Sequence, residues 1–90
     1  MASVAIAHGD DAVRQRIGAV LRERGLQVYA VEDFAGALDA SRQSRLCVIL
    51  VEPSLLLREA QDVRPRVRQA AGYQVPLMAL IHRVDGELRE

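Results

Sequence analysis

The six residues LCVILV, at positions 46–51, decide the class of fold, because every one of them is apolar. A strand that is apolar on both faces has to be buried on both faces, which is typical of the interior of a parallel β-sheet covered by helices. A second short run, SVAIA, occupies positions 3–7. We therefore expect 3–7 to form a first strand and 46–51 to form a central one. Cys47, the only cysteine, is expected to be a buried small hydrophobe within this strand.

The segment after the first strand carries the signals of a helix. Asp10 or Asp11 can cap its start, because an aspartate oxygen accepts the unpaired amide hydrogens of a first turn. Gly25 is predicted to end it in a left-handed conformation. Between these limits one apolar stripe recurs at helical spacing, while the arginines, Arg14 among them, are predicted to face water. The stripe consists of Val13, Ile17, Val20 and Leu21.

Strands and helices continue to alternate after this helix, which favours a parallel sheet covered on both faces. Residues 26–31 are predicted as a second strand, and Glu32 and Asp33 open a short helix. The stretch 53–64 is left open between a loop, a short helical turn and an exposed contact surface. That surface would be formed by Leu55, Leu56 and Leu57.

The last quarter of the chain completes the alternation. Pro65 suits the first position of a helix that runs to about residue 71, where Gly72 ends it. Residues 75–82 are predicted as a fourth strand. Residues 84–90 are left open between the start of another helix and a tail.

Composition points to a single globular domain, 1–90, since half of the residues are apolar and 27% are charged. Twelve arginines balance twelve acidic residues and there is no lysine, so the net charge gives no argument for nucleic acid or an anionic membrane. The apolar runs are far shorter than the roughly 18 residues of a membrane helix. The first residues lack the basic region of a secretory signal. A cytoplasmic protein without membrane contact is expected.

Four segments together resemble the receiver domain of bacterial response regulators. Residues 4–14 are similar to its first strand, acidic pair and first helix, and 25–38, with the pair Ala37-Leu38, to its second strand and helix. Residues 45–53 and the proline-led 75–81 are similar to its third and fourth strands. The resemblance implies an α/β fold of the flavodoxin-like type, with a parallel sheet in the order 2-1-3-4. It also implies that a receiver's fifth strand and last helix are lacking, and that the chain acts in two-component signalling and transcription regulation.

The positions that carry receiver chemistry hold other residues in this chain. In the family, an acidic pair after the first strand binds magnesium, an aspartate after the third accepts the phosphoryl group, and a threonine or serine after the fourth detects it. By resemblance, His8 and Gly9 stand at the acidic pair, Glu52 at the phosphoacceptor and Ile81 at the hydroxyl position. The lysine that ends the fifth strand has no counterpart. A glutamate without neighbouring carboxylates to hold magnesium is not expected to be phosphorylated.

Other chemistry at this edge of the sheet is conceivable but weaker. The predicted strand order brings His8, Glu52 and His82 together, and two histidines with a glutamate can hold zinc with one position open. We favour the simpler interpretation that both histidines are partly exposed residues at strand ends. No glycine-rich phosphate loop or nucleophile elbow accompanies them. We therefore expect no enzyme activity, no metal and no cofactor.

The predicted fourth strand would be an apolar edge of the sheet, and unpaired backbone groups at an edge invite another strand. A second copy in a two-fold dimer, or another signalling protein, could supply it. We therefore predict a phosphorylation-independent pseudo-receiver that acts as a protein–protein interaction module, most simply as a homodimer. The candidate interface residues are Leu55, Leu56, Leu57, Val75, Leu77, Ala79 and Ile81.

Two other functions stay open. One is a phosphoacceptor that uses Glu52, Asp10 or Asp11. The other is a small DNA-associated regulator that contacts phosphates through an arginine cluster, although a solvated helix face is the favoured interpretation of this cluster. With one phenylalanine and two tyrosines, the chain has few rings on which bases could stack. The arginines concerned are Arg58, Arg64, Arg66 and Arg68.

Overall fold

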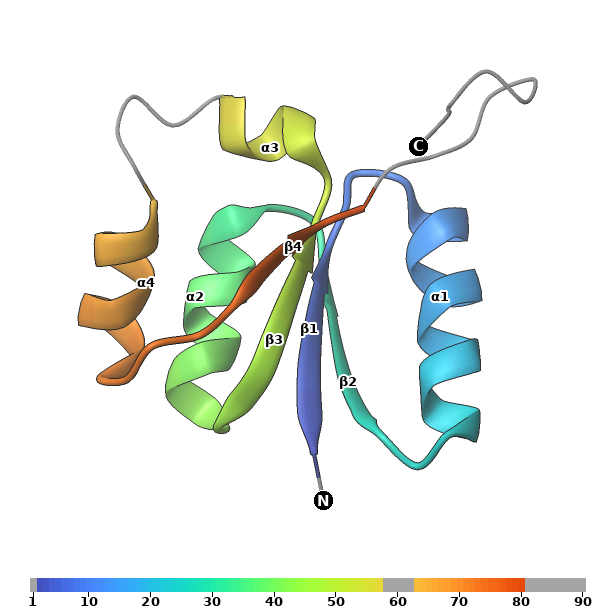
Figure 1. Cartoon of the computed structure of the whole chain (residues 1–90). Coiled ribbons are helices and arrows are strands. Elements are labelled where there is room, and N and C mark those ends of the chain that lie inside the picture. Colours follow the sequence, from blue (N-terminus) through green and yellow to red (C-terminus); the bar gives the residue numbers. More distant parts are fainter. Residues whose placement is uncertain (1, 58–62, 81–90) are drawn as a thin grey trace.

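The computed structural model describes residues 2–57 and 63–80, in which one β-sheet carries helices on both faces (Figure 1). The strands are β1 (Ser3–Ala7), β2 (Gln27–Val31), β3 (Leu46–Val51) and β4 (Leu77–Ala79). The helices are α1 (Asp11–Glu23), α2 (Phe34–Gln43), α3 (Pro53–Leu57) and α4 (Arg64–Ala71). All strand pairs are parallel and the order is β2-β1-β3-β4, which confirms the predicted order and is consistent with the flavodoxin-like fold.

The two most apolar segments form the interior of the sheet. All five residues of β1 are buried, and β1 pairs with β2 on one side and with β3 on the other. Strand β3 lies between β1 and β4, which confirms the central position predicted for 46–51. The prediction for Cys47 is wrong, because this residue is exposed. The register of β3 against β1 shifts between Ser3 and Val4, and Cys47 falls at this irregularity.

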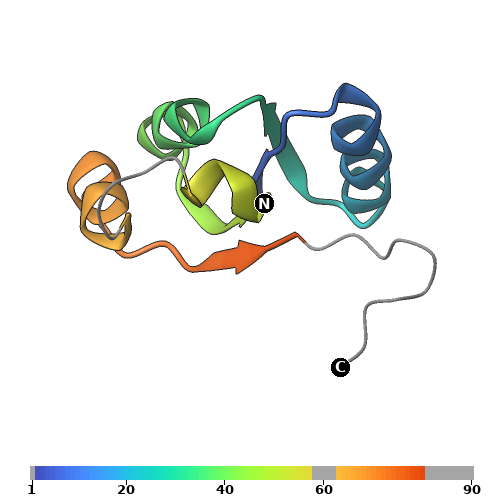
Figure 2. The same ribbon diagram turned by 90° about the horizontal axis from the view of Figure 1, so that it is seen from above.

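The main core lies on one face of the sheet, under α2 and α4 (Figure 2). Alternate residues of the central strands, Ala5 and Ala7 of β1 and Ile49 and Val51 of β3, point into it and are fully buried. On the other face, α1 packs on β2 and β1. Within the described ranges, no helix is long and apolar enough to cross a membrane.

Helix α1 begins at the predicted cap and ends before Gly25, whose φ of 86° is the left-handed conformation that favours glycine. Its apolar stripe is wrong at Val20, which is 49% exposed. The buried position is Gly18, whose Cα faces Val28 of β2. Helix α1 is therefore turned toward β2, and Val20 lies on the side of the helix away from that strand.

The structure assigns part of the stretch 53–64 that the sequence left open, whereas 58–62 and the open segment 84–90 lie outside the described residues. Residues 53–57 form the short helix α3, and its Leu55 is buried in the core rather than exposed. Helix α4 starts one residue before Pro65, and Gly72 follows it with φ of 83°, as predicted.

Strand β4 is shorter than the predicted 75–82. Its register pairs Ile49 with Leu77 and Val51 with Ala79. Val51, the last residue of β3, pairs with Ala79, and its carbonyl oxygen still accepts the backbone N–H of Leu80. Residues 81–82 of the predicted strand lie outside the described residues.

Candidate functional site

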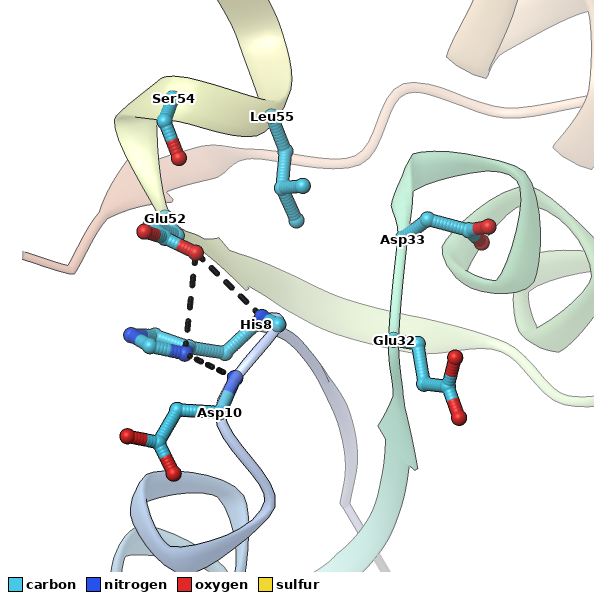
Figure 3. A pocket seen from close by; sticks show the side chains of 8 residues that line it. His8, Asp10, Glu32, Asp33, Glu52, Ser54 and Leu55 are labelled. Carbon is cyan, nitrogen blue, oxygen red and sulfur yellow. Dashed lines mark hydrogen bonds and ion pairs between the residues drawn. The ribbon is translucent and has the colours of Figure 1, made fainter.

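The carboxyl ends of β1, β2 and β3 meet at an open, polar hollow of about 740 Å³ (Figure 3). In open parallel sheets this edge is where ligands bind, because loops of several strands converge there. It is also the edge where the sequence placed its candidate residues. The lining consists of His8, Gly9, Asp10, Glu32, Asp33, Glu52, Ser54 and Leu55.

His8 directly follows β1 and is buried, with 4% of its surface exposed. Its backbone N–H donates to the carbonyl oxygen of Val31, which extends the ladder between β1 and β2 by one step. Its side-chain Nδ1 accepts the backbone N–H of Asp10 at 2.9 Å. This hydrogen bond uses Nδ1 as an acceptor and joins the ring to the turn that leads into α1. The predicted partial exposure of His8 is wrong, because the turn into α1 folds the ring inward onto its own backbone.

Glu52, the residue at the predicted phosphoacceptor position, follows β3 and reaches across to the end of β1. Its Oε1 accepts the backbone N–H of Gly9 at 3.3 Å and lies 3.6 Å from Nδ1 of His8 (Figure 3). This contact is an ion pair only when the His8 ring is protonated. The structure thus brings His8 and Glu52 to one edge of the sheet, as the predicted strand order implied, and the Gly9 amide holds the carboxylate.

The two aspartates after Gly9 have different roles. Asp10 is the N-cap of α1, and its Oδ1 accepts the backbone N–H of Ala12 at 2.9 Å. Asp11 is the first residue of the helix and does not cap it. Its carboxylate accepts hydrogen bonds from Arg14 at 3.0 Å and from Gln15 at 2.9 Å. Only Asp10 therefore lines the hollow, and the cap predicted for both residues belongs to Asp10 alone.

Arg14 contacts the backbone of His8, a residue that lines the hollow, contrary to the prediction that Arg14 faces water. Its side chain is only 12% exposed, and Nη1 donates to the backbone carbonyl oxygen of His8 at 2.6 Å. The guanidinium thus pairs with the carbonyl of the residue that directly follows β1. No sequence signal distinguishes Arg14 from the exposed arginines of the same helix.

Glu32 and Asp33 complete the acidic lining, and the sequence analysis assigned them only to the start of a helix. Asp33 does cap α2, with its Oδ1 accepting the backbone N–H of Gly36 at 2.9 Å. Their place at the hollow was nevertheless foreseeable, because they follow β2 and the carboxyl ends of parallel neighbours share one edge. Figure 3 shows both across the hollow from His8 and Glu52.

The acidic residues do not converge on one point. Asp10 and Asp33 each use a carboxylate oxygen to cap a helix, and Glu52 is held by Gly9. Among residues 2–57 and 63–80, no group of three or more histidine, cysteine, aspartate or glutamate side chains is arranged to hold a metal ion. His82, the third predicted zinc ligand, and Ile81, the predicted switch position, lie outside these ranges. Backbone amides thus donate to the carboxylates of Asp10, Asp33 and Glu52 at this edge of the sheet.

No protein-family model, no curated protein and no solved structure matches the chain. Functional assignment therefore depends on the fold and on the contacts of the described residues.

The candidate interface residues do not form one surface. Leu55 and Val75 are each 5% exposed and belong to the core, so they offer nothing to a partner. Leu56 and Leu77 are half-buried against the same core, whereas Ala79 is exposed. The side chain of Leu57 and all of Ile81 lie outside the description. The large exposed hydrophobic residue of β4 is instead Met78, 58% exposed, which the sequence analysis did not single out.

Proposed function

We propose that the protein is a receiver-like binding module that acts through protein–protein contact, independently of phosphorylation, in bacterial signalling or regulation. The outer edge of β4 is the observation that carries this proposal. Among residues 2–57 and 63–80, strand β4 pairs with β3 alone, and no other described strand pairs with its outer edge. The carbonyl of Pro76 accepts the Ile49 amide, and the Leu80 amide donates to Val51, so residues 76 and 80 point their backbone groups at β3. By alternation, Leu77 and Ala79 direct theirs outward, where another strand can pair with them.

The contacts of Glu52 support independence from phosphorylation. Phosphoryl transfer to a carboxylate needs a magnesium ion, which binds oxygen ligands in a nearly octahedral shell. The carboxylates of Asp10 and Asp33 are occupied in helix caps, and His8 stands beside Glu52 where the family has an acid. In the signalling role proposed, the protein would work in the cytoplasm.

The phosphoacceptor alternative is tested by chemistry. The protein is incubated with acetyl phosphate and magnesium, and its intact mass is then measured. We expect no gain of a phosphoryl group, either in the wild type or in Glu52→Asp. The variant provides the shorter aspartate side chain but adds no ligands for magnesium. It therefore separates the effect of side-chain length from the effect of the missing metal ligands. A phosphoryl group on either protein would contradict the proposal.

The edge itself is tested with Ala79→Pro. Proline removes the outward N–H of residue 79 but no hydrogen bond to β3, so it blocks strand addition with little effect on the sheet. Analytical ultracentrifugation of both proteins shows whether a second copy is the partner, since such a dimer dissociates in the variant. A monomer in both cases assigns the edge to another signalling protein. A dimer that persists in Ala79→Pro would place the contact elsewhere and contradict the proposal.

A further inference from the structure

The surface beside the edge of β4 is apolar on the α1 face of the sheet. Met78 pairs in register with Leu50, and both point to this face because their neighbours Leu77 and Ile49 point into the core under α2. Helix α1 packs on β2 and β1, and no described helix covers the part of this face formed by β3 and β4 (Figure 2). We call the exposed and half-buried residues here the apolar strip. It consists of Val48, Leu50 and Met78.

The opposite face beside the same edge is basic. Helix α4 presents Arg64, Arg66 and Arg68 to solvent and contains no acidic residue. Arg64 and Arg68 line a hollow of about 330 Å³ together with Gln74, which lies three residues before β4. Arg68 makes no ion pair with any residue in the described ranges. A group that approaches the edge from this side therefore meets the positive charge of Arg68.

A strand added to β4 would present its side chains alternately to these two faces. Those on the α1 face would extend the apolar strip beyond Met78, and those on the α4 face would point toward Arg64 and Arg68. We infer that the partner is another protein, whose extended segment alternates apolar and acidic side chains and pairs with β4. This inference rests on the proposed binding role of the β4 edge and adds the chemistry of the partner.

Charge also argues against a second copy of the chain as the occupant. Antiparallel pairing of β4 with itself has a two-fold axis perpendicular to the sheet, so both copies keep the same face on the same side. Two α4 helices, each with an exposed Arg68 that makes no ion pair within the described ranges, would then flank the axis and repel one another. Both apolar strips would stay uncovered. An acidic and apolar segment from another protein avoids both costs.

The test uses three synthetic peptides of about ten residues, enough for one strand. One alternates valine and glutamate, one alternates valine and lysine, and one has the first composition arranged in two blocks. Binding to the full chain is measured by fluorescence anisotropy at several salt concentrations. We expect the valine–glutamate peptide to bind about tenfold more tightly than the valine–lysine peptide at low salt, with the ratio falling as salt rises. The peptide whose valines and glutamates are arranged in two blocks should bind more weakly than the alternating one, because its glutamates would fall on both faces of the sheet.

Variants locate the binding. Arg68→Glu should weaken binding of the valine–glutamate peptide about fivefold, because it turns an attraction into a repulsion. Arg22→Glu is the matched control and should leave binding unchanged, since Arg22 is an exposed residue of α1, which packs on β2 at the other edge. Ala79→Pro should abolish binding of the peptide. Thermal melts establish that each variant is folded, and the peptide comparison on the wild type depends on no variant.

The other outcomes separate this inference from the proposed function. Equal binding of both alternating peptides, lost in Ala79→Pro, would keep the edge as a strand acceptor and overturn the acidic preference. A dimer that dissociates in Ala79→Pro would assign the edge to a second copy, with the same consequence. A monomer that binds no peptide would overturn both. Salt-dependent binding of duplex DNA that is lost in Arg68→Glu but kept in Ala79→Pro would assign the arginines to nucleic acid and overturn the inference.

Discussion

Tyr73 shows how one side chain joins two loops that are distant in sequence. Its hydroxyl accepts the backbone N–H of Leu46 at 2.7 Å and lies 3.1 Å from the carbonyl oxygen of Ser44, to which it can donate. The guanidinium of Arg45 stacks over the ring, 4.3 Å from its centroid. The segment that leads into β4 is thereby fastened to the start of β3. Nothing in the sequence indicated this contact, because it depends on how the two loops meet.

Removing this hydroxyl should destabilise the fold. Tyr73→Phe keeps the ring and its contact with Arg45 but leaves the amide of Leu46, a buried residue, without its partner. We expect a loss of about 1–2 kcal/mol in the free energy of unfolding, measured by urea denaturation. Tyr29→Phe is the control, because the hydroxyl of Tyr29 makes no hydrogen bond within the described ranges, and it should change stability by less than about 0.5 kcal/mol. Equal effects of both substitutions would mean that the Tyr73 hydroxyl does not support the sheet.

At the scale of elements, the start of α1 distinguishes two neighbouring aspartates that the sequence could not separate. Asp10 accepts the amide of Ala12, whereas Asp11 forms an ion pair with Arg14 on the helix surface. Asp10→Ala should therefore cost about 1 kcal/mol of stability, the usual value of an N-cap. Asp11→Ala should cost no more than about 0.5 kcal/mol, because its carboxylate is exposed and the pair is screened by water. Chemical denaturation of the two variants side by side checks the order, and a reversed order would show that Asp11 stabilises the helix more.

Hydrophobic pattern predicted the elements whose burial decides their structure. Strands β1 and β3 are apolar at nearly every position, and only the interior of a covered sheet accommodates such segments. The hydrophobic pattern did not predict features that depend on how a strand or helix packs against its neighbour. The short length of β4 and the exposure of Cys47 at a shift in register are two such features. The exposure of Val20 follows from the way α1 is turned toward β2, with Gly18 at the contact, and periodicity alone does not predict this.

Across the whole molecule, the strand order separates two surfaces. The order β2-β1-β3-β4 gathers the carboxyl ends of three strands at the acidic hollow, and this much of the site could be predicted once the order was known. The contacts that hold the hollow together could not be predicted from the sequence. The hydrogen bonds from the Gly9 amide to Glu52 and from the Arg14 guanidinium to the His8 carbonyl both depend on the path of one turn. The edge of β4 that no other described strand pairs lies along the side of the sheet. A change at the hollow would therefore leave this edge intact.

The order of hydrogen exchange should follow this architecture. Amides of β1, a strand paired on both sides and buried throughout, should exchange most slowly of those in the sheet, because they open only with global unfolding. In β4 the amides of Leu77 and Ala79 point outward and should exchange much faster than the amide of Leu80, which donates to Val51. Hydrogen–deuterium exchange followed by NMR resolves these residues individually. Saturation with the valine–glutamate peptide should slow Leu77 and Ala79 selectively, since they would gain the partners that a free edge lacks. Uniform exchange along 77–80, or protection by the peptide at the acidic hollow instead, would contradict the assignment of the β4 edge as the binding surface.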